Sequence, residues 1–141
     1  MRLTKKLAAL PVTLLCLSAL SGCNGSSGDN EDTDNGGVYS LSLSYKTVVD
    51  GQCAEATDEL SFAANSTFCA VAKLTQDNSN RSGKLIAFSS SFGELSVATK
   101  LTDSNGLAEV MVSNSTSAEG AGTLTANYSE GDNSANSTRN F

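Results

Sequence analysis

Residues 39–45 read Tyr-Ser-Leu-Ser-Leu-Ser-Tyr, and this stretch decides the fold class. Its apolar side chains, at Tyr39, Leu41, Leu43 and Tyr45, are separated by single serines. Because successive side chains of a β-strand point to opposite faces, this alternation predicts a strand with one buried and one exposed face. The stretch therefore indicates a sheet whose apolar face packs against a core.

Strand-like alternation continues along the chain after this first stretch. Further strands are predicted at residues 67–75, 84–89, 95–101, 107–112 and 123–128, with turn-forming residues at 77–80, 103–106 and 119–122. Asn-Gly can take positive φ at little steric cost, so Asp103, Asn105 and Gly106 are predicted to form a tight hairpin turn. No stretch of comparable length has helical period. About seven short strands in residues 38–141 predict one all-β domain, an antiparallel β-sandwich.

Residues 1–22 have the pattern of a cleaved signal peptide. A basic start at residues 1–6 precedes the apolar run 7–20, which is shorter than the roughly 20 apolar residues of a membrane-spanning helix. The run ends in Leu20-Ser21-Gly22-Cys23, which resembles the lipobox of bacterial lipoproteins. That resemblance implies that Cys23 is acylated and becomes the new N-terminus, so that lipid anchors the protein to a membrane. The alternatives are an ordinary secretory signal with a coincidental cysteine, and a short transmembrane helix.

Residues 23–37 are predicted to be a disordered tether, because no apolar side chain follows Cys23 in this segment. Its four acidic residues lack the glycine position and the closing glutamate of a calcium-binding loop, so no metal site is predicted at Asp29, Glu31, Asp32 and Asp34. Asn24 stands where inner-membrane lipoproteins of the enterobacterial type carry aspartate. By resemblance to that rule, the protein is expected in the outer membrane, facing either the periplasm or the outside.

Charge and cysteine count narrow the partners and the compartment. Removal of residues 1–22 takes away three of the 9 basic residues and none of the 15 acidic ones, so the formal net charge changes from -6 to -9. Such an acidic chain excludes nucleic acid as a partner, since phosphate contacts need clustered basic residues. Cys16 leaves with the signal and Cys23 is acylated. Cys53 and Cys69 then remain as an even pair outside the cytoplasm, where we predict a disulfide; two separate buried thiols are the alternative.

The chain carries no set of residues typical of catalysis. It contains no histidine, which removes the usual general base and the commonest metal ligand. Glu94, Asp103 and Glu109 are the candidate carboxylates for a glycosidase, but acids in loops and at strand edges are more typical of solvated charge. An aromatic platform for sugars is also weak, since the chain has no tryptophan. We therefore predict no catalytic residue, no cofactor, no metal and no enzyme activity.

Five segments follow one another in a recognisable order and spacing. They read Ala72-Lys73-Leu74-Thr75-Gln76-Asp77, Ile86-Ala87-Phe88-Ser89, Phe92-Gly93-Glu94-Leu95-Ser96, Lys100-Leu101-Thr102-Asp103-Ser104-Asn105-Gly106-Leu107-Ala108-Glu109-Val110 and Gly120-Ala121-Gly122-Thr123-Leu124-Thr125-Ala126. Together they resemble the bacterial Ig-like repeat, the group 1 Big domain, of invasin- and intimin-type surface proteins. The resemblance covers residues 38–141 and implies an Ig-like β-sandwich, with Phe88 in the core between the small inward residues Ala108 and Ala126. The family usually forms tandem arrays, and the two cysteines are not part of its pattern.

Three functions remain open at this point. The first is a non-enzymatic, lipid-anchored lipoprotein of the cell envelope, whose single Ig-like domain is structural or adhesive and contacts an envelope or surface protein. The second is the binding of a glycan or another small ligand. The third is an enzyme or an enzyme inhibitor, and an inhibitor needs only a shaped loop. The fold does not decide among them, because Ig-like sandwiches host unrelated functions.

Overall fold

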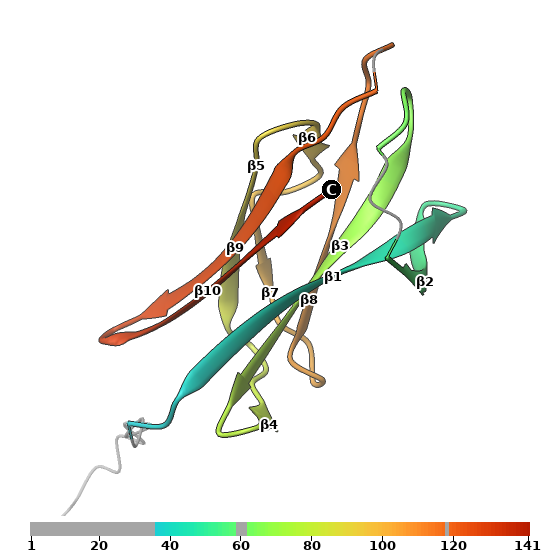
Figure 1. Cartoon of the computed structure of the whole chain (residues 1–141). Helices are drawn as coiled ribbons and strands as arrows, with labels where there is room; N and C mark the ends of the chain where they lie inside the picture. The colour runs from blue at the N-terminus through green and yellow to red at the C-terminus, as the bar shows by residue number, and fades with distance from the viewer. Residues whose placement is uncertain (1–35, 59–61, 118) are drawn as a thin grey trace, which may run out of the picture. The chain divides into compact units, whose positions relative to one another are not determined.

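The computed structural model describes residues 36–58, 62–117 and 119–141 (Figure 1). The predictions for the signal peptide, for Cys23 and for the tether up to residue 35 lie outside these residues. The described part of the chain is built of strands, turns and loops. Within it, no helix is long and apolar enough to cross a membrane.

Two antiparallel sheets make up the described chain. Their strands are β1 (Tyr39–Val49), β2 (Gln52–Thr57), β3 (Thr67–Gln76), β4 (Ser79–Asn80), β5 (Leu85–Ser90), β6 (Glu94–Leu95), β7 (Thr99–Leu101), β8 (Leu107–Ser113), β9 (Thr123–Glu130) and β10 (Asn133–Asn140). The first sheet has the order β2-β1-β3-β8-β6, with β4 paired to β3, and the second has the order β10-β9-β5-β7. The predicted all-β antiparallel sandwich is confirmed, with ten strands in the described residues where about seven were expected.

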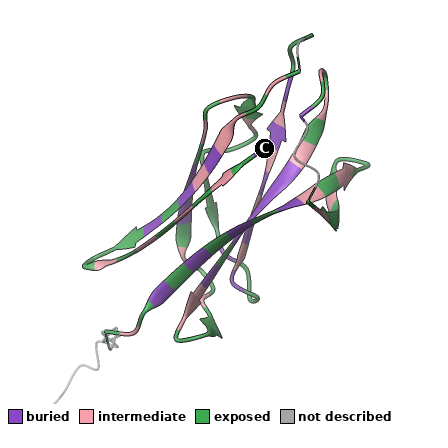
Figure 2. Cartoon of the chain, viewed as in Figure 1, coloured by how far each residue is buried: buried purple, intermediate pink, exposed green. Residues whose placement is uncertain are grey.

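The alternation in β1 places one face of this strand in the core. Its four apolar residues, Tyr39, Leu41, Leu43 and Tyr45, are each at most 9% exposed, whereas the serines between them are exposed. Strand β3 lies between β1 and β8, and the middle of β3 is buried on both faces (Figure 2). Each large apolar side chain contributes about 1.5–3 kcal/mol when it is fully buried, so these rows hold the sandwich together.

Small side chains allow the two sheets to pack closely. Ala72 of β3 lies opposite Ala108 of β8, and both are fully buried. In the second sheet, Phe88 of β5 lies opposite Ala126 of β9, and the Phe88 ring is 5% exposed. The bulky ring and the small residues share one core, as the family resemblance implied.

The strand predicted at residues 95–101 is not continuous, because the chain changes sheets within it. Strand β6 pairs with β8 in the first sheet, and β7 pairs with β5 in the second. The N–H of Ser96 donates to the Met111 carbonyl of β8 at 2.9 Å, and two residues later the Ala98 carbonyl accepts from Phe88 of β5 at 2.8 Å. The prediction of one strand was therefore wrong. Apolar alternation runs through the switch and does not reveal the change of partner.

The turn at residues 103–106 joins β7 of the second sheet to β8 of the first, so it is not a hairpin turn between paired strands. The Asp103 carboxylate accepts two backbone N–H donors, those of Asn105 and Leu107, each at 2.8 Å. Gly106 has a φ of 73°, and a Cβ at this position would lie 2.5 Å from the backbone oxygen of residue 74. The positive φ and the lack of room for a Cβ atom both favour glycine at this position.

The other two predicted turns differ in outcome. Asp77 and Asn78 form a two-residue hairpin turn between β3 and β4, and both have positive φ. Residues 119–122 form no hairpin turn, because they belong to the connection from β8 of the first sheet to β9 of the second. There Gly122 and Phe141 exchange two backbone hydrogen bonds of 2.9 Å.

Strands β2 and β10 are not predicted by the apolar pattern. Each follows a two-residue hairpin turn: Asp50 and Gly51 both have positive φ between β1 and β2, and Gly131 opens the turn between β9 and β10. Asp-Gly and Gly-Asp are typical of such turns, since these residues adopt positive φ readily. These dipeptides are the signal from which both strands could have been found.

Candidate functional site

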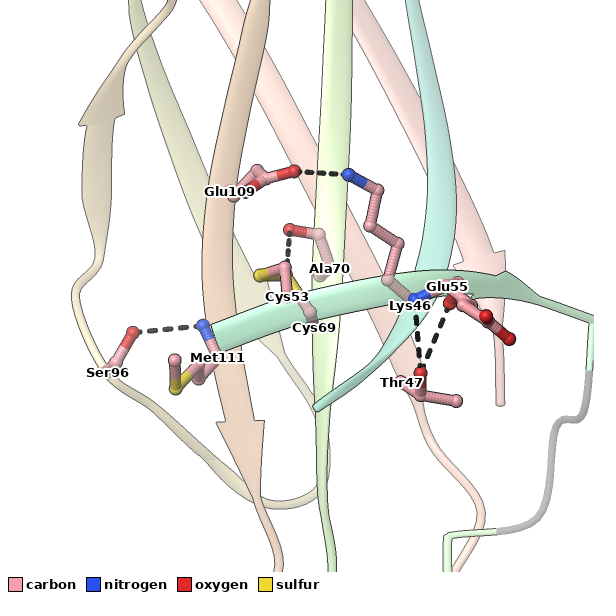
Figure 3. Close-up of a disulfide and its surroundings, with 9 residues drawn as sticks. All are labelled: Lys46, Thr47, Cys53, Glu55, Cys69, Ala70, Ser96, Glu109 and Met111. Atoms are coloured by element: carbon pink, nitrogen blue, oxygen red, sulfur yellow. Dashed lines mark hydrogen bonds and ion pairs between the residues drawn. A yellow bond between two sulfur atoms is a disulfide. The ribbon is translucent and has the colours of Figure 1, made fainter. Parts of the chain in front are cut away.

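A disulfide between Cys53 of β2 and Cys69 of β3 attaches the β1–β2 hairpin to the outer face of the first sheet (Figure 3). The two Cα atoms are 5.5 Å apart, and the two cysteines are 16 positions apart in the sequence. Cys69 is fully buried, whereas every residue of β2 is exposed or only partly buried. The predicted disulfide is confirmed. It joins a strand with little apolar burial of its own to the most deeply buried strand of the sheet.

An ion pair lies beside the disulfide. Lys46 of β1 lies opposite Cys69, and Glu109 of β8 lies opposite Val71, so their side chains meet across β3 (Figure 3). The Lys46 Nζ and Glu109 Oε1 atoms are 2.6 Å apart, and the two side chains are 28% and 36% exposed. An ion pair as exposed as this contributes about 0.2–1 kcal/mol.

The same group has the residue types of a metal site but not the chemistry. The sulfur atoms of Cys53 and Cys69 and a carboxylate oxygen of Glu109 lie within 4.8 Å of one another. Cysteine binds metal as a thiolate, and here the two sulfur atoms are bonded to each other. One carboxylate that is already paired with Lys46 does not make a metal centre, so the disulfide is structural in this oxidised state.

A groove of about 580 Å³ opens beside this ion pair, and we name it the β8 groove. It is lined by the β1–β2 hairpin at Gly51, Gln52 and Cys53, by the sheet-switch segment and β7 at Ser96, Val97, Lys100 and Leu101, and by Asp103, Leu107, Glu109, Val110 and Met111. Val97 and Leu101 are unusually exposed for apolar residues, at 45% and 58%. The groove therefore combines accessible apolar surface with a few charged groups.

The carboxylates of the β8 groove have structural partners. The pKa of Asp103 is lowered from its ordinary value of 3.8, and the largest cause is the hydrogen bond that its carboxylate accepts from the N–H of Leu107. Glu109 is paired with Lys46, and Glu94 lies on β6, away from the groove lining. General acid–base catalysis needs a proton donor and a proton acceptor that face a substrate. Of the three candidate acids, Asp103 and Glu109 line the groove and are held by these bonds, whereas Glu94 does not line it.

A second pocket, of about 350 Å³, is walled by aromatic rings at Tyr45, Phe62, Phe68 and Phe141. The rings of Phe62 and Phe68 are 4.6 Å apart, and that of Phe141 is 5.1 Å from Phe68. Edge-to-face and tilted contacts of this kind add about 0.5–1.5 kcal/mol each beyond burial. The pocket is therefore the open side of a packed aromatic cluster that stabilises the sandwich.

Sequence reasoning identified part of the β8 groove and missed the rest. It singled out Cys53, Asp103 and Glu109, which all line the groove. It missed the exposed side chains of Val97 and Leu101, because apolar residues in an alternating strand are expected to face the core. No signal in the sequence marks the sheet switch that turns them outward. The predicted lipidation residue, Cys23, lies outside the described residues.

Comparison with known proteins finds a similar fold in one solved structure. No protein-family model matches the chain, and no curated protein matches it. One solved structure, the D0-D1 domain of intimin, matches with a TM-score of 0.50 and 19% sequence identity. The match covers 72% of this chain and 45% of that chain, so this protein corresponds to less than half of the intimin structure. At this identity the likeness concerns the fold, and the described chain has an Ig-like fold similar to that of the D0-D1 domain of intimin.

Proposed function

We propose that the protein is a non-enzymatic lipoprotein of the cell envelope that presents a single Ig-like domain for structural or adhesive contact with another protein. Residues 1–22 are the signal peptide, Cys23 carries the lipid that anchors the chain in the outer membrane, and residues 23–37 are the tether. The domain itself occupies residues 38–141. The observation that carries this proposal is the intimin-type sandwich, which supplies surfaces for contact. Two of the three candidate acids, Asp103 and Glu109, by contrast, hold structural bonds.

The anchor is tested by the intact mass of the protein purified from membranes of its native host, with and without reductant. A mass that begins at Cys23 and includes acyl chains is expected, with a gain of two protons on reduction of the Cys53–Cys69 bond. The Cys23→Ser variant should be recovered without lipid in the soluble fraction. Recovery of the wild-type chain in soluble, unacylated form would contradict the anchor.

The role is tested in a strain that lacks the protein. Loss of surface adhesion or of envelope integrity in detergent is expected, and the wild-type gene should restore it while the gene for Cys23→Ser should not. A deletion strain with unchanged adhesion and unchanged envelope integrity would contradict a structural or adhesive role.

A second candidate function, glycan binding, is favoured by the outer face of the β9–β10 hairpin. All eight residues on this face are uncharged and polar: Thr123, Thr125, Asn127, Ser129, Ser134, Asn136, Thr138 and Asn140. Some of them are bonded to each other, such as Thr125 and Thr138 at 3.2 Å. In an acidic protein, a face without charge suits a neutral polysaccharide. A saturable rise in melting temperature with a neutral glycan, abolished in Asn136→Asp, would support this function over the first.

A further inference from the structure

Beyond its pairing with β6 at Val112 and Ser113, the edge of β8 that faces away from β3 is paired at two places. The carbonyl of Met111 accepts from the N–H of Ser96 at 2.9 Å. The N–H of Met111 donates to the Ser96 hydroxyl at 3.0 Å (Figure 3). At the other end of the strand, the N–H of Leu107 donates to the Asp103 carboxylate, and its carbonyl accepts from the Asp103 N–H, both at 2.8 Å. The backbone N–H and C=O groups of Met111 and Leu107 on this edge are therefore already hydrogen-bonded.

Glu109 lies between these two residues on the same edge. In an antiparallel strand, alternate residues direct both backbone groups to the same side, so the N–H and C=O of Glu109 point where those of Leu107 and Met111 point. Within the described residues, no hydrogen bond from another backbone group or side chain reaches either of them. An unpaired N–H and C=O on a strand edge are a template for an additional strand.

The sheet switch explains why this position is open. A continued β6 would pass alongside Glu109, but after Ser96 the chain leaves the first sheet, and Ala98 bonds to Phe88 of the second sheet instead. Within the described chain, the missing continuation of β6 leaves no strand of the first sheet beside Glu109 on this edge. Glu109 lines the β8 groove, which opens at this place.

The walls of the β8 groove suit the side chains of an extended peptide. Val97 and Leu101 present exposed apolar side chains on one side, and the hairpin that carries Cys53 is held on the other side by the disulfide. The side chain of Glu109 is bonded to Lys46, which keeps it on the outer face of the sheet. The backbone of Glu109 thus remains accessible between two fixed walls.

We propose that the β8 groove binds an extended polypeptide segment of a protein partner, which adds to β8 as a strand hydrogen-bonded to the backbone of Glu109. Main-chain bonds of this kind provide affinity, while pockets for alternate side chains provide specificity. The segment carries apolar side chains at every second position, which contact Val97 and Leu101. This inference rests on the proposed role as a protein-binding module and names the surface that performs it.

Peptide selection tests this inference directly. The full chain, expressed with its own N-terminal residues, is used to select binders from a random library of seven-residue peptides, and the consensus peptide is then synthesised. We expect apolar residues at alternate positions and a saturable shift of the Glu109 amide resonance. A second peptide, with N-methyl groups at alternate amides, keeps the side chains but loses the N–H donors along one of its two strand edges. Its affinity should fall at least tenfold.

Matched variants locate the binding surface. Leu101→Asp should lower the affinity for the consensus peptide at least tenfold. Leu85→Asp should change it less than twofold, because Leu85 lies directly opposite Leu101, is 55% exposed and does not line the groove. Equal melting temperatures of the two variants would show that both are folded.

Failure to enrich any peptide would overturn the inference. Binding that is insensitive to both N-methylation and Leu101→Asp would also overturn it. These outcomes are independent of the mass measurement at Cys23, so failure of the groove and failure of the lipid anchor can be told apart.

Discussion

The two edge hairpins of the sandwich are held in place by different means. In the β9–β10 hairpin, eight consecutive residue pairs run without interruption, and β9 buries Leu124, Ala126 and Tyr128. In the β1–β2 hairpin, only four pairs form and the register shifts between Lys46 and Val48, while β2 buries no apolar side chain. A covalent bond replaces hydrophobic burial in the second case. The disulfide-held hairpin is also the one that lines the β8 groove.

The largest loss of stability is expected from the hairpin that depends on burial. Leu124→Ala removes a side chain that is 0% exposed, so it should lower the free energy of unfolding by about 2–5 kcal/mol in denaturant unfolding. Ser129→Ala, at an exposed position of the same strand, should change it by no more than about 0.5 kcal/mol. Equal losses in the two variants would show that burial does not hold this hairpin.

Removal of the disulfide tests the other hairpin. A closed loop of about 15 residues stabilises a protein by roughly 3 kcal/mol in the chain-entropy model, so the Cys53→Ala, Cys69→Ala double variant should lose about that much. Hydrogen exchange should accelerate more in β2 than in β9 and β10. Unchanged protection of β2 would mean that its four pairs with β1 suffice, and the contrast between the hairpins would disappear.

The same contrast explains how much of the fold the sequence predicts. Strands with a buried row, such as β1, β3 and β9, are predicted from alternation because burial imposes period two. Strand β2 has no such row, and β10 alternates only small or polar residues, so each can be found only from its turn dipeptide. The disulfide is predictable because only Cys53 and Cys69 remain once Cys16 and Cys23 are assigned to the signal peptide and to lipidation. The β8 groove is not, since it arises from a change of sheets between Ser96 and Ala98 that leaves the alternation intact.

Two glycines with similar conformations separate the effect of backbone strain from the effect of crowding. Gly51, in the hairpin turn, has a φ of 75° and no atom within 4 Å of an added Cβ, whereas a Cβ on Gly106 would meet the Leu74 carbonyl oxygen. Gly51→Ala should therefore cost only the strain of positive φ, about 1–2 kcal/mol. Gly106→Ala should cost about 1–3 kcal/mol more, because it adds overlap with a packed strand. Equal melting temperatures for the two variants would contradict the close approach of the 103–106 turn to β3.

The smallest loss of stability is expected from a hydrogen bond between β1 and β10. The Tyr45 hydroxyl donates to the carbonyl of Arg139 at 3.0 Å, so Tyr45→Phe should cost about 0.5–1.5 kcal/mol at pH 8. Burial raises the pKa of Tyr45 from 10.0 to about 12. Because the folded state keeps this proton longer than the unfolded chain, the contribution is complete below pH 10 and is lost as the pH rises through about 12.

Urea unfolding at pH 8 and pH 11 should therefore show a smaller loss of stability in Tyr45→Phe than in the wild type. The pKa of Lys84 is also raised, chiefly by its hydrogen bond to Glu130, and this contribution is lost at alkaline pH in the same direction. Both proteins share that ion pair, so the difference between them isolates Tyr45. Equal losses would mean that the hydroxyl ionises as freely in the folded protein as in the unfolded chain. In that case the Tyr45 hydroxyl would add no pH-dependent stability to the contact between β1 and β10.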